Sequence, residues 1–104
     1  MTFQDRVIVV TGGASGMGRA TATLLGSQGA RVVIADIDTE AGSRVATAIG
    51  PNASFDKTDL TSLDDLEALA ARTEERFGRI DGLANVAAVF PRHSFLETPR
   101  QAYS

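Results

Sequence analysis

The sequence contains no cysteine, and this absence removes two kinds of site at once. Neither a disulfide framework nor a thiolate metal site can form, and the composition agrees with a reducing, cytoplasmic environment. Positive charge is also scarce, because 10 lysines and arginines stand against 13 acidic residues, for a net charge of -3. Nucleic acid is therefore not an expected partner, since its recognition depends on clustered basic residues.

Long hydrophobic runs are missing as well. No apolar run approaches the roughly 20 residues that a membrane-spanning helix needs, and the first residues lack the basic and apolar regions of a signal peptide. We therefore expect a protein that does not interact with a membrane. At 104 residues, with 43% hydrophobic and 22% charged residues, the chain fits one globular domain.

Apolar runs rich in valine and isoleucine alternate with segments of helical periodicity, a pattern typical of βαβ units on a parallel sheet. The expected strands are Arg6–Val10, Arg31–Ala35, Ala53–Asp56 and Gly82–Val86. The sequence thus predicts an α/β fold: a partial Rossmann-like, doubly wound parallel sheet of four strands in the order 3-2-1-4, with helices on both faces.

Three helices are expected between these strands, each with an apolar face toward the sheet. In the first, which ends at Gly29, this face comprises Met17, Ala20, Thr21, Leu24 and Leu25. In the second, which begins at the N-cap Asp38 and ends at Gly50, it comprises Ala41, Val45, Ala48 and Ile49. In the third, from about Thr61 to Phe77 with Gly78 as its end, it comprises Leu63, Leu66, Leu69 or Ala70, Thr73 and Phe77.

A glycine-rich turn, Thr11–Gly18, follows the first strand and opens the first helix. In such a turn the backbone can approach a pyrophosphate, and the free N–H groups of the helix N-terminus point at its negative charge. Gly12 is expected to make the tight turn, Gly16 to let the phosphates approach, and Gly18 to let helix and strand pack closely. A P-loop is excluded, because no Lys-Ser or Lys-Thr pair follows Gly16.

An acidic residue, Asp36, ends the second strand about 20 residues beyond the glycine turn, where dinucleotide-binding units place a carboxylate that accepts the ribose hydroxyls. The next residue is Ile37 rather than an arginine that could hold a 2′-phosphate. This pair predicts NAD rather than NADP as the cofactor. The alternative is that Asp36 helps to cap the second helix, although Asp38 is better placed for that role.

Together, these motifs resemble the N-terminal half of the short-chain dehydrogenase/reductase family. The family's T-G-x-x-x-G-x-G pattern is matched by Thr11-Gly12 with Gly16 and Gly18, and its acidic residue after the second strand by Asp36. Its adenine-pocket aspartate is matched by Asp59, and its fourth-strand motif, Asn-Asn-Ala-Gly, by Asn85-Val86-Ala87-Ala88. The resemblance implies a single NAD-binding Rossmann-type domain over residues 1–104. It implies a parent oxidoreductase that interconverts secondary alcohols and ketones by hydride transfer.

The resemblance also implies roles around the cofactor. Ser15 and the backbone N–H of Met17 would donate to the phosphates. Asp59 and Leu60 would bind the adenine. The ribose and the nicotinamide side would be lined by Asn85 and the backbone of Ala87.

Several of these assignments have alternatives. Asp56 competes with Asp59 for the adenine, and Asp59 can instead be a loop residue beside a helix N-cap at Thr61. Met17 can pack in the core as well as donate its N–H. His93, the one histidine, is expected to be a loop residue rather than a catalytic group.

The catalytic residues of the family have no match here. Its members use a tyrosine with a lysine four residues later, and a serine that holds the substrate oxygen. Tyr103 is the only tyrosine, and the only lysine, Lys57, lies beside the proposed adenine pocket. We therefore assign no catalytic residue and no metal ligand, expect the catalytic segments to lie beyond Ser104, and expect this chain alone to be inactive.

Two other functions remain open. One is a non-catalytic module that binds NAD or an adenine nucleotide. The other is an interaction protein that pairs its fourth strand with another chain, including a second copy of itself, because an apolar strand edge left open favours pairing. An alcohol or ketone substrate is expected only for a complete parent enzyme.

Overall fold

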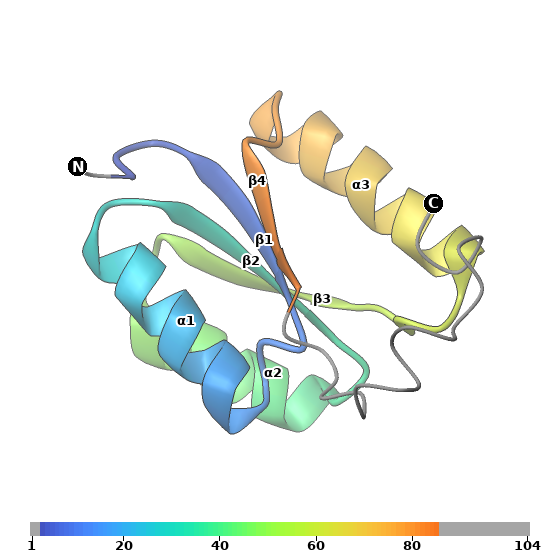
Figure 1. Ribbon diagram of the computed structural model, residues 1–104, viewed down its shortest axis with the longest axis horizontal. Coiled ribbons are helices and arrows are strands. Elements are labelled where there is room, and N and C mark those ends of the chain that lie inside the picture. Colours follow the sequence, from blue (N-terminus) through green and yellow to red (C-terminus); the bar gives the residue numbers. More distant parts are fainter. Residues whose placement is uncertain (1–2, 86–104) are drawn as a thin grey trace, which may run out of the picture.

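The computed structural model describes residues 3–85. Its four parallel strands are β1 (Val7–Thr11), β2 (Arg31–Asp36), β3 (Ala53–Lys57) and β4 (Gly82–Asn85). They form one sheet in the order β3-β2-β1-β4, which confirms the predicted strand order (Figure 1). The part of the predicted fourth strand at Val86 lies outside the described residues.

The helices cover both faces of the sheet, as predicted for a doubly wound fold. Helices α1 (Gly16–Ser27) and α2 (Thr39–Ile49) lie on one face, and α3 (Leu63–Phe77) lies on the other (Figure 1). No helix within residues 3–85 is both long enough and apolar enough to cross a membrane.

The core consists of two layers because side chains alternate across each strand. Toward α1 and α2, Ile8, Val10, Val32 and Ile34 pack with Ala22, Val45 and Ala46. Toward α3, the packed residues are Val9, Val33, Ala35 and Leu69. The central strand β1 is therefore buried along its whole length, which fixes the position of the glycine turn that follows it.

The predicted buried face of α1 is wrong in part. Met17 and Leu24 are 66% and 59% exposed, and the buried positions of this helix are Gly18 and Ala22. The cause is the glycine: Gly18 packs against the backbone of the glycine turn and rotates Ala22, one turn later, toward the sheet. Ala20 faces solvent for the same reason.

The faces of the other two helices also differ from the predictions. In α2, Ala48 is exposed, and Ala46 is buried in its place, because Gly42 lies directly against the ring of Phe55 and the residue four positions later shares its face. In α3, Leu63 is 64% exposed. The helix begins at Leu63, two residues later than the predicted start at about Thr61.

Hydrogen bonds fix the helix starts. Ser62, not Thr61, is the N-cap of α3, and its hydroxyl accepts from the N–H of Asp65. Asp38 caps α2 as predicted, accepting from the N–H of Ala41 at 3.0 Å. The predicted end of α3 is confirmed at Gly78, which takes the left-handed conformation with φ 81°.

Asp81 joins β4 to β1 at the amino-terminal edge of the sheet. Its side chain is 13% exposed, Oδ2 accepts from the backbone N–H of Val7 at 2.8 Å, and Oδ1 pairs with Arg79 at 2.6 Å. The Val7 N–H and then the Arg79 guanidinium hold the pKa of the Asp81 carboxyl below its ordinary value. The charged carboxylate is therefore the form that holds these strands together.

We predict that Asp81→Asn lowers the thermal unfolding midpoint at neutral pH. A carboxyl whose folded pKa is depressed stabilises the protein above its unfolded pKa of about 3.9, and this contribution is lost as pH falls through the folded pKa. The difference in midpoint between wild type and variant should therefore shrink in acid. Glu67→Gln, which removes one exposed carboxylate from α3, is the control and should change little. A deficit that is the same at every pH would contradict this role.

Candidate functional site

The candidate site lies at the carboxyl-terminal edge of the sheet. The chain passes from β1 to β2 and β3 on one side, then crosses back to place β4 on the other side of β1. In doubly wound sheets, ligands bind in the crevice outside the strand ends at such a switch point. The glycine turn, the N-terminus of α1 and the ends of β1 and β4 meet there (Figure 1).

The glycine turn is held by close backbone contacts. Gly12 has φ 73°, a conformation that favours glycine, and donates its N–H to Ala35 O at 2.8 Å. A Cβ on Gly18 would overlap the carbonyl oxygen of Gly12, so the close contact at Gly18 is with the turn itself, whereas the expected contact was with the strand. Gly13, which has no predicted role, packs on β2: a Cβ at this position would lie 2.6 Å from Cγ2 of Ile34.

Gly16 has a different environment. Apart from the backbone of its own helix and its chain neighbours, a Cβ at this position would meet no atom of the described residues within 4 Å. Within residues 3–85, the backbone N–H groups of Gly16 and Met17 have no hydrogen-bond acceptor. The Met17 side chain is exposed, so it does not take the alternative role in the core. The N-terminus of α1 thus combines open space with two free donors.

Ser15 is the N-cap of α1. Its Oγ accepts from the N–H of Gly18 at 3.1 Å and donates to Gly12 O at 2.8 Å. The single hydroxyl hydrogen is therefore already engaged within the turn. Donation from Ser15 to a phosphate stays a prediction, and it requires the hydroxyl to leave Gly12 O.

Asp36 connects three segments at this edge. Its Oδ2 accepts from the N–H of Ala14 in the glycine turn at 3.2 Å, and its Oδ1 accepts from the N–H of Asp38 at 3.0 Å. Its backbone carbonyl accepts from the N–H of Thr58, after β3, at 3.0 Å. Since Asp38 caps α2, Asp36 is not needed for that purpose, and the Ile37 side chain beside it is 59% exposed.

Asp59 forms a local turn. Its Oδ1 accepts from the N–H and the hydroxyl of Thr61, at 2.9 and 2.6 Å. Both hydrogen bonds hold the pKa of Asp59 below its ordinary value, and the one from the hydroxyl has the larger effect. Its own N–H donates to Oδ2 of Asp65 at 2.9 Å. Leu60 packs against the core layer under α3. An adenine-binding role for Asp59 and Leu60 stays a prediction.

The competing carboxylate, Asp56, is committed elsewhere. It binds the guanidinium of Arg72 on α3 through both oxygens, at 2.6 and 2.9 Å. This pairing raises the pKa of Arg72 and fastens α3 to β3. Both carboxylate oxygens of Asp56 are therefore engaged by Arg72, whereas Asp59 has no such ion pair within residues 3–85.

Asn85 lies at the switch point. The hydroxyl of Thr11, at the end of β1, donates to Oδ1 of Asn85 at 2.9 Å, so the two strand ends are joined by their side chains. Ala87, Val86 and Ala88 lie outside the described residues, as do His93 and Tyr103. The nicotinamide-side assignment of Ala87 stays a prediction.

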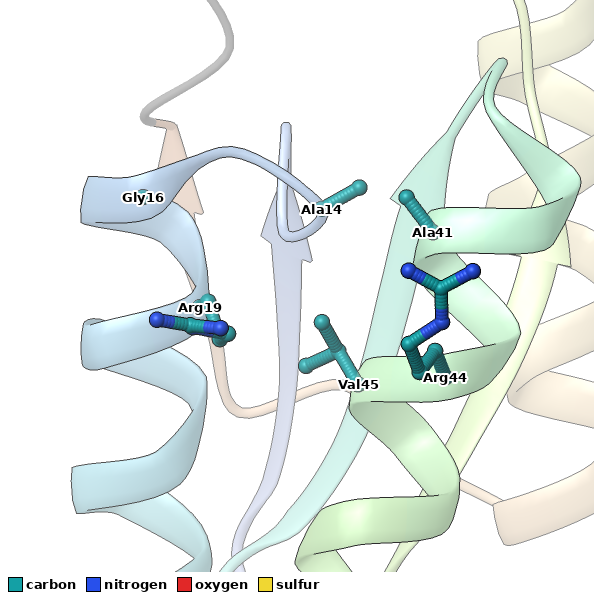
Figure 2. A pocket seen from close by; sticks show the side chains of 6 residues that line it. All are labelled: Ala14, Gly16, Arg19, Ala41, Arg44 and Val45. Atoms are coloured by element: carbon teal, nitrogen blue, oxygen red, sulfur yellow. The ribbon is translucent and has the colours of Figure 1, made fainter.

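A pocket of about 280 Å³, which no sequence pattern predicted, opens between α1 and α2. Figure 2 shows Arg19 on α1 and Arg44 on α2 at its sides. It is lined by Ala14, Gly16, Arg19, Ala41, Arg44 and Val45. The sequence does place an arginine in the first half of each helix. It could not predict this pocket, because apolar periodicity does not show which faces of two helices lie side by side.

Residues 6–104 match the family described as short chain dehydrogenase. The chain belongs to the short-chain dehydrogenase family. Over 87 residues it is 46% identical to 2,5-dichloro-2,5-cyclohexadiene-1,4-diol dehydrogenase from Sphingobium indicum, covering 84% of this chain and 35% of that protein. Over 90 residues it is 41% identical to galactitol 2-dehydrogenase from Agrobacterium fabrum, covering 86% of this chain and 35% of that protein.

Solved structures of the family share the fold. The 3-ketoacyl-(acyl-carrier-protein) reductase of Brucella melitensis, crystallised in complex with NADH, superposes with a TM-score of 0.76 at 33% identity, covering 79% of this chain and 34% of that protein. The chain thus spans about a third of the length of these short-chain dehydrogenases. Its relatives are oxidoreductases of the same family.

We predict opposite outcomes for alanine at two glycines of this site. Gly18→Ala should lower the free energy of unfolding by about 1–3 kcal/mol, because its methyl group meets backbone that cannot move aside. Gly16→Ala, the matched control, should stay within about 1 kcal/mol of wild type, since its methyl group enters open space and alanine favours helix. Urea denaturation measures both. Equal losses at both positions would refute the close contact at Gly18.

Proposed function

We propose that this chain binds NAD across the glycine turn, as the cofactor-binding part of a short-chain dehydrogenase that interconverts secondary alcohols and ketones. The observation that carries the proposal is the open space at Gly16 beside the free N–H groups of Gly16 and Met17. A pyrophosphate needs both, a close backbone approach and donors at a helix N-terminus. Bound NAD would supply the hydride-transfer chemistry of the family.

Asp36 is suited to hold the adenosine ribose. Each of its carboxylate oxygens accepts one backbone N–H, from Ala14 and from Asp38, and each carboxylate oxygen can accept a second hydrogen bond. The two backbone bonds hold the carboxylate in place before a ligand binds. The ribose hydroxyls would then meet an acceptor that needs no rearrangement, which reduces the cost of binding.

The same carboxylate supports NAD over NADP. A 2′-phosphate placed 4 Å from Asp36 is opposed by about 4 kcal/mol at an effective dielectric of 20, and by less in a hydrated groove. Ile37 supplies no compensating cation. We therefore propose a preference for NAD of roughly one to two decades in the dissociation constant.

The remaining assignments belong to the same proposal. Asp59 and Leu60 would hold the adenine, Asn85 the ribose next to the nicotinamide, and the catalytic chemistry would need segments of a longer polypeptide. A cytoplasmic location stays a prediction from the composition. Self-association through β4 also stays a prediction; its Leu83 side chain is 63% exposed.

The direct prediction is that the folded chain binds NAD, and binds AMP more weakly because AMP lacks the pyrophosphate. Gly16→Ala should weaken NAD binding by about tenfold, or 1.4 kcal/mol, since its methyl group takes the space that the phosphates need. Isothermal titration calorimetry measures these affinities, and circular dichroism confirms that each sample is folded. A folded wild-type chain that binds neither nucleotide would refute the proposed function.

A second prediction concerns cofactor choice. Asp36→Asn keeps the size of the side chain and removes its charge, so the ratio of the NADP to the NAD dissociation constant should fall by about tenfold. Asp38→Asn is the matched control: it removes the same charge two residues later and keeps a good N-cap, so the ratio should stay within twofold, roughly. An unchanged ratio in Asp36→Asn would show that Asp36 does not select the cofactor.

A further inference from the structure

We propose that a second pocket, between α3 and the edge strand β3, binds a small organic carboxylate through Arg76 and Ser54. The pocket has a volume of about 150 Å³ and is formed by residues of β2, β3 and α3. It lies on the face of the sheet that α3 covers, whereas the glycine turn leads into α1 on the other face (Figure 1). A ligand in this pocket therefore does not require NAD at the glycine turn.

The size and the base of the pocket limit its ligand. Pockets that enclose a whole drug-sized ligand or cofactor have volumes of about 300–1,000 Å³. This pocket, at about 150 Å³, is suited to a single ring with one polar group. Its base is apolar, because Val33 on β2 is 4% exposed and Phe77 at the end of α3 packs against the same core layer. The ligand therefore needs a small apolar body.

The charge that lines the pocket favours an anion. Asp56 and Arg72 neutralise each other, since the carboxylate accepts from the guanidinium at 2.6 and 2.9 Å. Arg76, one helical turn after Arg72, also lines the pocket and forms no ion pair within residues 3–85. The pocket thus keeps a positive charge that no acidic partner in this part of the chain neutralises.

The guanidinium of Arg76 is held by an aromatic ring. Its central carbon lies over the ring of Phe77, 5.1 Å from the ring centre. A guanidinium that contacts a ring through its face keeps its in-plane N–H groups available for two parallel bonds to a carboxylate. The hydroxyl of Ser54, which also lines the pocket, forms no hydrogen bond among the described residues and supplies a further donor.

A carboxylate suits this pocket better than a phosphate. The negative charge of Asp56 opposes a dianion more strongly than a monoanion, even though Arg72 balances it. Buried phosphate oxygens also need several donors, and the apolar side chains of Val33 and Phe77 offer none. A singly charged group with an apolar body meets both constraints.

The test uses benzoate as the probe, titrated into the chain and followed by amide NMR spectra. Benzoate should bind with a dissociation constant in the millimolar range, as expected for a small ligand with one charged contact, and the largest shifts should occur at Val33, Ser54 and Phe77. Benzamide keeps the ring without the charge, and acetate keeps the charge without the ring. Each should bind at least about tenfold more weakly. Shifts centred on Gly16 and Met17 would place the carboxylate at the N-terminus of α1 and would overturn the proposal.

Substitutions test the two donors. Arg76→Gln, at an exposed helix position, should weaken benzoate binding by about tenfold, and Ser54→Ala by about threefold. Arg44→Gln is the matched control, because it removes an exposed arginine from α2 on the other face of the sheet, and it should leave the affinity unchanged. Circular dichroism confirms that each variant is folded.

Equal weakening by Arg76→Gln and Arg44→Gln would show attraction to net charge rather than a built site and would overturn the proposal. Equal binding of benzoate and benzamide would overturn it as well. A folded chain that binds benzoate in this pocket but does not bind NAD would refute the proposed function and leave this site standing.

Discussion

The contact between Gly18 and the carbonyl of Gly12 is the constraint on which the candidate site depends. No side chain fits between the first turn of α1 and the glycine turn, so the helix begins directly against the end of β1. That closeness sets the rotation of α1 and buries Ala22. It also turns Met17 outward and leaves the N–H groups of Gly16 and Met17 without an acceptor within residues 3–85. The features expected of a phosphate cradle thus follow from one backbone contact.

Asp36 extends this constraint to the rest of the carboxyl edge. Through its side chain and its carbonyl it joins the glycine turn, the start of α2 and the end of β3. A residue proposed to select the cofactor is therefore also part of the scaffold that positions the turn. This double use explains why asparagine, which keeps the shape of the side chain, is a better test of selection than alanine.

Most of the fold could be predicted from the sequence, because strand order and strand bounds depend on apolar runs and on βαβ connections. The helix faces were predicted less well. Apolar periodicity assigned Met17, Leu24, Ala48 and Leu63 to buried faces, but Gly18 and Gly42 decide the rotation of α1 and α2 through contacts that have no apolar signature. Ser62 likewise places Leu63 at the exposed start of α3.

The site shows the same division. Spacing along the chain located the glycine turn, Asp36 and Asn85, because those residues lie at strand ends that a parallel sheet brings to one edge. Spacing could not show that Asp56 pairs with Arg72 or that the Ser15 hydroxyl is engaged by Gly12. It also could not show the Arg19 and Arg44 pocket. These depend on side-chain contacts between separate elements.

The central claim is that the glycine turn and the N-terminus of α1 bind the pyrophosphate of NAD. Amide NMR spectra of the chain, recorded while NAD is added, test it most directly. The largest shifts should occur at the amides of Gly12 through Gly18 and at Asp36, with little change at Val7, Arg31 and Asp81 on the opposite edge. Shifts spread evenly over the sheet, or confined to β4, would contradict it.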